Sequence, residues 1–161
     1  GLLLNGGGHK MAAGLTVARD KLEDLHAFMN ERVAQDVASN EVVPTLRIDG
    51  AMALSGVKPE FVAALEKLAP FGSGNAEPRF AFTSVRVAKA DVVGANHVRC
   101  FLTDSSGGRL KAIAFRSVGE PLGDALLDKT GLGLQLAGKL RPDNWQGRND
   151  VQFIIDDAAR L

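Results

Sequence analysis

The chain has 161 residues, 45% of them hydrophobic, and a formal net charge of zero. This length suits one large domain or two small ones with real cores. No apolar run approaches the roughly 20 residues of a membrane-spanning helix, and the opening Gly1-Leu2-Leu3-Leu4 is too short for a signal-peptide core. We therefore expect a cytoplasmic protein. The single Cys100 excludes an internal disulfide and a cysteine-rich metal cage, and we expect it in the core.

The first distinctive stretch holds three consecutive glycines, in the run GGGHKMAAG at residues 6–14. We expect a short strand at residues 2–4, a glycine loop, and a second apolar stretch at residues 12–17. Glycines leave backbone N–H groups uncovered, and clustered N–H groups form anion-binding concavities. The candidate phosphate-binding residues are Gly6, Gly7, Gly8 and His9. The same pattern also fits a tight turn between two strands with a solvated His9.

Two stretches have apolar residues at helical spacing, and they predict helices at about residues 20–38 and 59–68. The apolar face of the first helix consists of Leu22, Leu25, Phe28, Met29, Val33 and Val37. Pro59 suits the first turn of the second helix. Alternation over residues 44–50 predicts a strand between them. The second helix is followed by Pro70, Gly72, Gly74 and Pro78, which mark a module boundary.

From residue 80 the apolar pattern alternates, as is typical of strands. It predicts five strands, at about residues 80–87, 98–103, 110–115, 132–140 and 151–155, with a hairpin turn at 104–108. A short helix fits residues 121–129, and Asp156-Asp157 fits a turn at the end of the last strand. Five strands with a helix between the third and fourth are the order of an oligonucleotide-binding fold, a partly open Greek-key barrel. The expected fold class is therefore α+β.

Positive charge concentrates in this second half of the chain. Residues 1–50 carry five Lys/Arg and seven Asp/Glu, a net −2, whereas residues 79–148 carry eleven and six, a net +5. A local basic surface favours a phosphodiester backbone, and in such barrels the second and third strands and nearby loops contact it. The candidate nucleic-acid contacts are Arg99, Phe101, Lys111, Arg116, Trp145 and Arg148. Phe101 and Phe115 fit the barrel core as well as base stacking, and Trp145 fits packing as well as stacking.

Three segments together resemble one family. GLLLNGGGHKMAAGLTV resembles the Gly-Gly-Gly-His motif of the DHH-associated domain of DHH-superfamily phosphoesterases. LEKLAPFGSGNAEPRF, at residues 65–80, resembles the stretch that leads into the oligonucleotide-binding (OB) domain of RecJ-type single-strand-specific exonucleases, and residues 145–156 resemble the closing hairpin of that domain. The resemblance implies part of a DHH-associated α/β module at residues 1–50, a helical connector at 51–78, and an OB domain at 79–161.

This resemblance implies a parent enzyme that removes nucleotides from single-stranded DNA in the 5′-to-3′ direction during recombination and repair. The Asp-His-His motif that holds divalent metals in this superfamily is not in the sequence, where His9, His26 and His97 are scattered. We therefore expect no catalytic residue and no metal ligand here, with His9 at most an assistant, and a fragment that is inactive alone. Mn²⁺ or Mg²⁺ would belong to a missing N-terminal domain, which is an expected partner together with single-stranded DNA.

Three alternatives stay open. The glycine motif also resembles that of DHH-type phosphodiesterases acting on short oligonucleotides or cyclic dinucleotides, and that of the accessory domain of an alanyl-tRNA synthetase. The appended barrel argues against both. The third alternative is a non-catalytic module that binds single-stranded nucleic acid.

Overall fold

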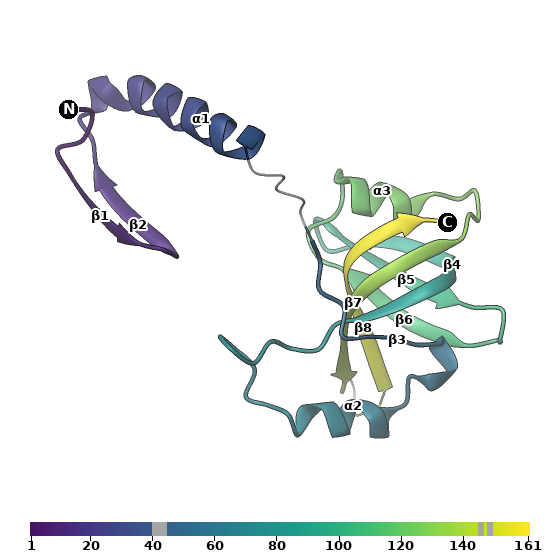
Figure 1. Cartoon of the computed structure of the whole chain (residues 1–161). Coiled ribbons are helices and arrows are strands. Elements are labelled where there is room, and N and C mark those ends of the chain that lie inside the picture. Colours follow the sequence, from purple (N-terminus) through teal and green to yellow (C-terminus); the bar gives the residue numbers. More distant parts are fainter. Residues whose placement is uncertain (40–44, 145–146, 148–149) are drawn as a thin grey trace. The chain divides into compact units, whose positions relative to one another are not determined.

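The computed structural model describes residues 1–39, 45–144, 147 and 150–161, which form two compact units, Gly1–Thr45 and Leu46–Leu161 (Figure 1). The segment 51–78, expected as a connector, belongs to the second unit. Within the described ranges, no helix is long and apolar enough to cross a membrane.

Unit 1 (residues 1–45) contains a β-hairpin and one helix. Strand β1 (Asn5–His9) pairs antiparallel with β2 (Ala12–Thr16), and a short 3₁₀ turn, η1 (Arg19–Lys21), leads into α1 (Leu22–Ser39). The expected strand at residues 2–4 followed by a glycine loop is therefore wrong. The glycines are ladder residues because the chain turns later, at Lys10 and Met11, and Gly8 lies so close to β2 that a Cβ there would be 2.6 Å from the Ala13 Cβ.

The apolar face of α1 is largely exposed. Leu25 is buried, but the other five residues of the predicted face are 49% to 57% exposed: Leu22, Phe28, Met29, Val33 and Val37. Most helical stability in proteins comes from packing of such a face rather than from intrinsic propensity. The described residues of unit 1 therefore contribute little packing to this helix.

Unit 2 (residues 46–161) is a closed barrel. Its five main strands are β4 (Phe80–Val93), β5 (His97–Thr103), β6 (Arg109–Ala114), β7 (Leu134–Asp143) and β8 (Asp150–Arg160). They follow the order β4-β5-β6-β8-β7, and β7 pairs back onto β4. The β6–β8 pair is parallel and the other barrel pairs are antiparallel. Helix α3 (Pro121–Leu127) lies between the third and fourth of these strands, which confirms the predicted α+β fold.

The residues before β4 complete unit 2. They form β3 (Gly50–Ala51), a 3₁₀ turn η2 (Leu54–Gly56) and α2 (Pro59–Glu66), and α2 and α3 lie at opposite ends of the barrel (Figure 1). The predicted strand at residues 44–50 is wrong, since residues 45–49 pair with no strand and β3 begins only at Gly50. One reason is that the Arg79 side chain, rather than a neighbouring strand, binds the carbonyl of Arg47, with an Nη1–O distance of 3.2 Å.

The barrel core consists of the inward-facing strand residues. Phe82 and Phe153 are almost fully buried and meet edge to face, with ring centroids 4.8 Å apart. Cys100 is 0% exposed, which confirms the expected core position. Burial raises the pKa of its thiol to about 12, so the reactive thiolate is suppressed.

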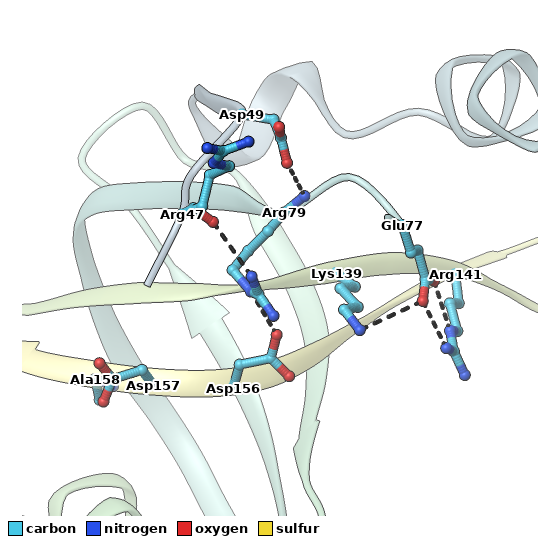
Figure 2. Close-up of polar contacts among 9 residues, drawn as sticks. All are labelled: Arg47, Asp49, Glu77, Arg79, Lys139, Arg141, Asp156, Asp157 and Ala158. Atoms are coloured by element: carbon cyan, nitrogen blue, oxygen red, sulfur yellow. Dashed lines mark hydrogen bonds and ion pairs between the residues drawn. The ribbon is translucent and has the colours of Figure 1, made fainter. Parts of the chain in front are cut away.

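Two side chains of the loop before β4 tie it to the barrel (Figure 2). Glu77 accepts two hydrogen bonds from Arg141 of β7, at 2.7 and 2.8 Å, and its carboxylate lies 3.6 Å from Lys139. Arg79 donates from Nε to Asp156 of β8 at 2.7 Å. The expected turn at Asp156-Asp157 is wrong, because β8 stays paired with β7 as far as Arg160.

We predict that Glu77→Gln lowers stability at neutral but not at acidic pH. The hydrogen bond from Arg141 holds the pKa of Glu77 below its ordinary value of 4.5. A carboxyl whose pKa is lower in the folded state stabilises that state above its unfolded pKa, and this contribution disappears as the pH falls through the folded value. The pair is partly exposed, so we expect a cost of at most about 1 kcal/mol at neutral pH.

Urea unfolding at about pH 7 and about pH 3 measures this difference. Glu66→Gln is the control, since Glu66 has no ion pair with any residue the structure describes. An equal cost of Glu77→Gln at both pH values would contradict the electrostatic explanation.

Candidate nucleic-acid interface

Strands β5 and β6 turn alternate side chains to the outside of the barrel. Val98, Cys100 and Leu102 of β5 are buried, as are Leu110, Ala112 and Ala114 of β6. Since successive strand residues point to opposite faces, the residues between them point outward. Phe101 stands directly opposite Lys111 in the ladder, and Arg99 stands opposite Ile113. The period-two pattern thus places an aromatic ring beside an ammonium group.

Three of the predicted contact residues meet in one pocket on this face. Arg99, Phe101 and Lys111 line a cavity of about 480 Å³, together with Arg109, Asp143 and Asp150, and with Val57, Pro59, Leu110 and Val151. We call it the Lys111 pocket. The ring of Phe101 is 41% exposed, so it is not a core residue. Phe115 is also outside the core, 49% exposed, with its ring 5.1 Å from that of His97.

Of the other three predicted contacts, the structure describes only Arg116. Arg116 follows the far end of β6 and does not line the pocket. Its backbone has a φ of 52° and its N–H donates to His97 Nδ1 at 2.9 Å. Trp145 and Arg148 lie outside the described residues. Two residues that flank their segment, Asp143 and Asp150, do line the pocket.

Three charged residues of the pocket are not among the contacts predicted from the sequence. Arg109 precedes Lys111 by two positions in one strand, so the alternation already places both on the same face. Asp143 and Asp150 lie between the predicted strands, whereas in the structure they end β7 and begin β8. No local pattern indicates these two, because they approach β6 only when β8 pairs with both β6 and β7.

Two cations of the surface are paired with carboxylates. Lys111 Nζ lies 2.6 Å from Asp143 Oδ2, and Arg99 Nη2 lies 2.5 Å from Asp91 Oδ2. Asp91 is the ladder partner of Arg99 on β4. Arg109 has no ion pair with any described residue. The pocket therefore combines the exposed ring of Phe101 with three cations. Two of them, Arg99 and Lys111, are paired with a carboxylate.

The candidate phosphate-binding residues lie in unit 1. All residues of β1 are exposed, including the three glycines. His9 Nδ1 accepts a hydrogen bond from the Met11 N–H at 3.2 Å. In the neutral imidazole the other nitrogen then carries the proton, so Nε2 is a donor of the kind a phosphate oxygen accepts. The described residues contain no group of three His, Cys, Asp or Glu placed to hold a metal ion.

A closed five-stranded barrel in which the third and fifth strands pair in parallel defines an oligonucleotide-binding fold. Residues 48–157 match the profile of the RecJ OB domain family. The chain belongs to this family, and the resemblance seen in the sequence is confirmed.

Relatives from bacteria match almost the whole chain. The single-stranded-DNA-specific exonuclease RecJ of Bacillus subtilis is 27% identical over 155 residues, which are 95% of this chain and 19% of that protein. The protein of the same name in Escherichia coli is 29% identical over 159 residues, 98% of this chain and 26% of that protein. The chain thus spans about a fifth to a quarter of these relatives' length.

The fold is also that of a solved structure. The crystal structure of RecJ from Thermus thermophilus in complex with Mn²⁺ superposes with a TM-score of 0.66 and 24% identity. The match covers 99% of this chain and 22% of that one. Both units of the chain therefore have counterparts in one larger protein.

Proposed function

We propose that this chain is the substrate-holding part of a single-stranded-DNA exonuclease, and that the outer face of β5 and β6 binds the strand. The observation that carries the proposal is the meeting of Arg99, Phe101 and Lys111 in one open pocket. An exposed ring offers a stacking surface to any base, and the cations contact phosphates. Each stacked base contributes about 1–3 kcal/mol, so one ring such as Phe101 matters to the affinity.

The exonuclease assignment rests on the family and on the names of its relatives. On this proposal the parent enzyme hydrolyses single-stranded DNA in the 5′-to-3′ direction in the cytoplasm, with Mn²⁺ or Mg²⁺ bound by a part of the parent outside this chain. The chain alone is inactive. Gly6, Gly7 and Gly8 offer backbone N–H groups, and His9 offers its Nε2 proton, to a phosphate of the same substrate. Arg116, Trp145 and Arg148 extend the contact beyond the Lys111 pocket.

Binding of labelled DNA to the whole chain tests this proposal. We expect salt-sensitive binding that prefers a single strand to a duplex, since stacking on Phe101 requires an unpaired base. Arg99→Ala combined with Lys111→Ala should abolish detectable binding, and Phe101→Ala should weaken it about tenfold. His9→Ala should change little, because a contact from the glycine strand alone is weak.

Phe115→Ala is the matched control for Phe101→Ala. Both rings are exposed to a similar degree, but Phe115 does not line the pocket. Equal affinity for duplex and single strand, or indifference to both pocket variants, would exclude this face as the binding site.

A further inference from the structure

We propose that Asp91 and Asp143 compete with nucleic-acid phosphate for Arg99 and Lys111, and so limit how tightly the barrel holds a strand. This inference rests on the proposed function and adds two residues that set the affinity of the same site. Both cations are already engaged, by Asp143 at 2.6 Å and by Asp91 at 2.5 Å. A phosphate oxygen needs the same N–H donors, so each carboxylate must yield or share its cation when a strand binds.

Partial burial makes this competition effective. The side chain of Asp143 is 16% exposed and that of Lys111 is 30% exposed, while Asp91 and Arg99 are 30% and 39% exposed. Fully exposed ion pairs are screened by water and salt, whereas partly buried charges attract each other more strongly. These carboxylates therefore hold their cations more firmly than those of an ordinary surface pair.

The barrel also prevents the aspartates from moving away. Asp91 faces Arg99 in the β4–β5 ladder, and Asp143 faces Asp150 in the β7–β8 ladder. Because both backbones are fixed by strand pairing, the pair separates only when one of its two side chains rotates. The two competing carboxylates, those of Asp91 and Asp143, are thus held near the cations by the paired strands of the barrel.

The charge of the pocket agrees with this role. The region 79–148 has a net charge of +5, but the pocket lining contains Asp143 and Asp150 beside Arg99, Arg109 and Lys111. Asp91 neutralises one of these cations from the adjacent strand. The excess positive charge of the region is therefore not concentrated where the strand would lie. Such an arrangement favours a strand that is held and released again over one that is held permanently.

Asp143→Asn tests the inference, with a labelled single strand of about 15 nucleotides and the whole chain, since an OB fold covers about 4–16 nucleotides. We expect binding about two- to fivefold tighter, the range for releasing one partly exposed ion pair. Asp128→Asn is the matched control: Asp128 pairs with Arg160 at 3.2 Å and does not line the pocket.

A double-mutant cycle separates competition for Lys111 from a general loss of negative charge. In a Lys111→Ala background, Asp143→Asn should tighten binding less than in the parent chain, because the cation with which Asp143 pairs at 2.6 Å is gone. Asp91→Asn with Arg99→Ala forms a second, independent cycle and serves if Asp143→Asn does not fold.

Two results would overturn the inference: affinity that is unchanged or weaker in both asparagine variants, or equal tightening with and without Lys111. Weaker binding would mean that the aspartates position the cations for phosphate. If Arg99→Ala with Lys111→Ala also leaves binding intact, the proposed function itself fails. If that double variant weakens binding and the asparagine variants do not tighten it, only the competition is excluded.

Discussion

Phe153→Ala is expected to destabilise unit 2 by about 3–5 kcal/mol, the range for removing a fully buried aromatic side chain. Phe153 lies on β8 with 0% of its surface exposed, and its ring meets Phe82 edge to face at 4.8 Å. The substitution removes this contact and leaves a cavity that five hydrogen-bonded strands cannot easily close. The free energy of unfolding in urea, followed by far-UV circular dichroism, measures the loss.

Phe101→Ala provides the comparison, because it removes the same ring from the outer face of the same barrel. Phe101 is 41% exposed, so its loss should cost less than about 1 kcal/mol. If the two variants are equally stable, β8 does not turn Phe153 into the core, and the barrel register given above is incorrect.

Gly138→Ala is expected to cost about 3 kcal/mol, at the upper end of the range for overpacking. Gly138 lies on β7 where the register with β8 shifts. A Cβ at this position would lie 2.0 Å from the carbonyl oxygen of Ile154 and 2.9 Å from the ring of Phe153. Both neighbours belong to β8, so the two strands would have to separate, and the hydrogen bonds that close the barrel would be disturbed.

The matched control is Gly72→Ala, in the loop before β4. A Cβ on Gly72 meets no atom within 4 Å, and its φ is not in the left-handed region. We expect Gly72→Ala to be within about 0.5 kcal/mol of the parent in the same urea experiment. A similarly small effect of Gly138→Ala would show that β7 and β8 are not in close contact there.

The strands and helices of unit 2 were predictable because their signals are local. Alternation of buried and exposed residues indicated β5 and β6, and Pro59 and Pro121 begin α2 and α3. The outward positions of Arg99 and Lys111 followed from the same alternation, since charged residues between buried ones face outward. The alternation left Phe101 open between core and surface, because either face of a strand accepts an aromatic ring.

The errors arose where a distant partner decides the structure. The glycines of β1 have no strand propensity of their own, and they are extended because β2 pairs with them. Asp156 suggested a turn, but Arg79 neutralises it and β8 continues. In residues 45–49 the alternation was present without a strand: the Arg47 carbonyl accepts a hydrogen bond from the Arg79 side chain, and the Asp49 carboxylate accepts one from the Arg79 backbone N–H.

The amino-acid sequence by itself determined the family, the order of five strands and one intervening helix, and the outward positions of the charged residues Arg99 and Lys111. These properties depend on residues a few positions apart in the chain, or on short sequence motifs that can be recognised without the fold. Only the tertiary structure decided that Asp143 reaches Lys111 and that Asp91 holds Arg99. Electrostatic pairing acts through space. Asp91 faces Arg99 because β4 and β5 pair as a hairpin, and Asp143 reaches Lys111 only when β8 pairs with both β6 and β7.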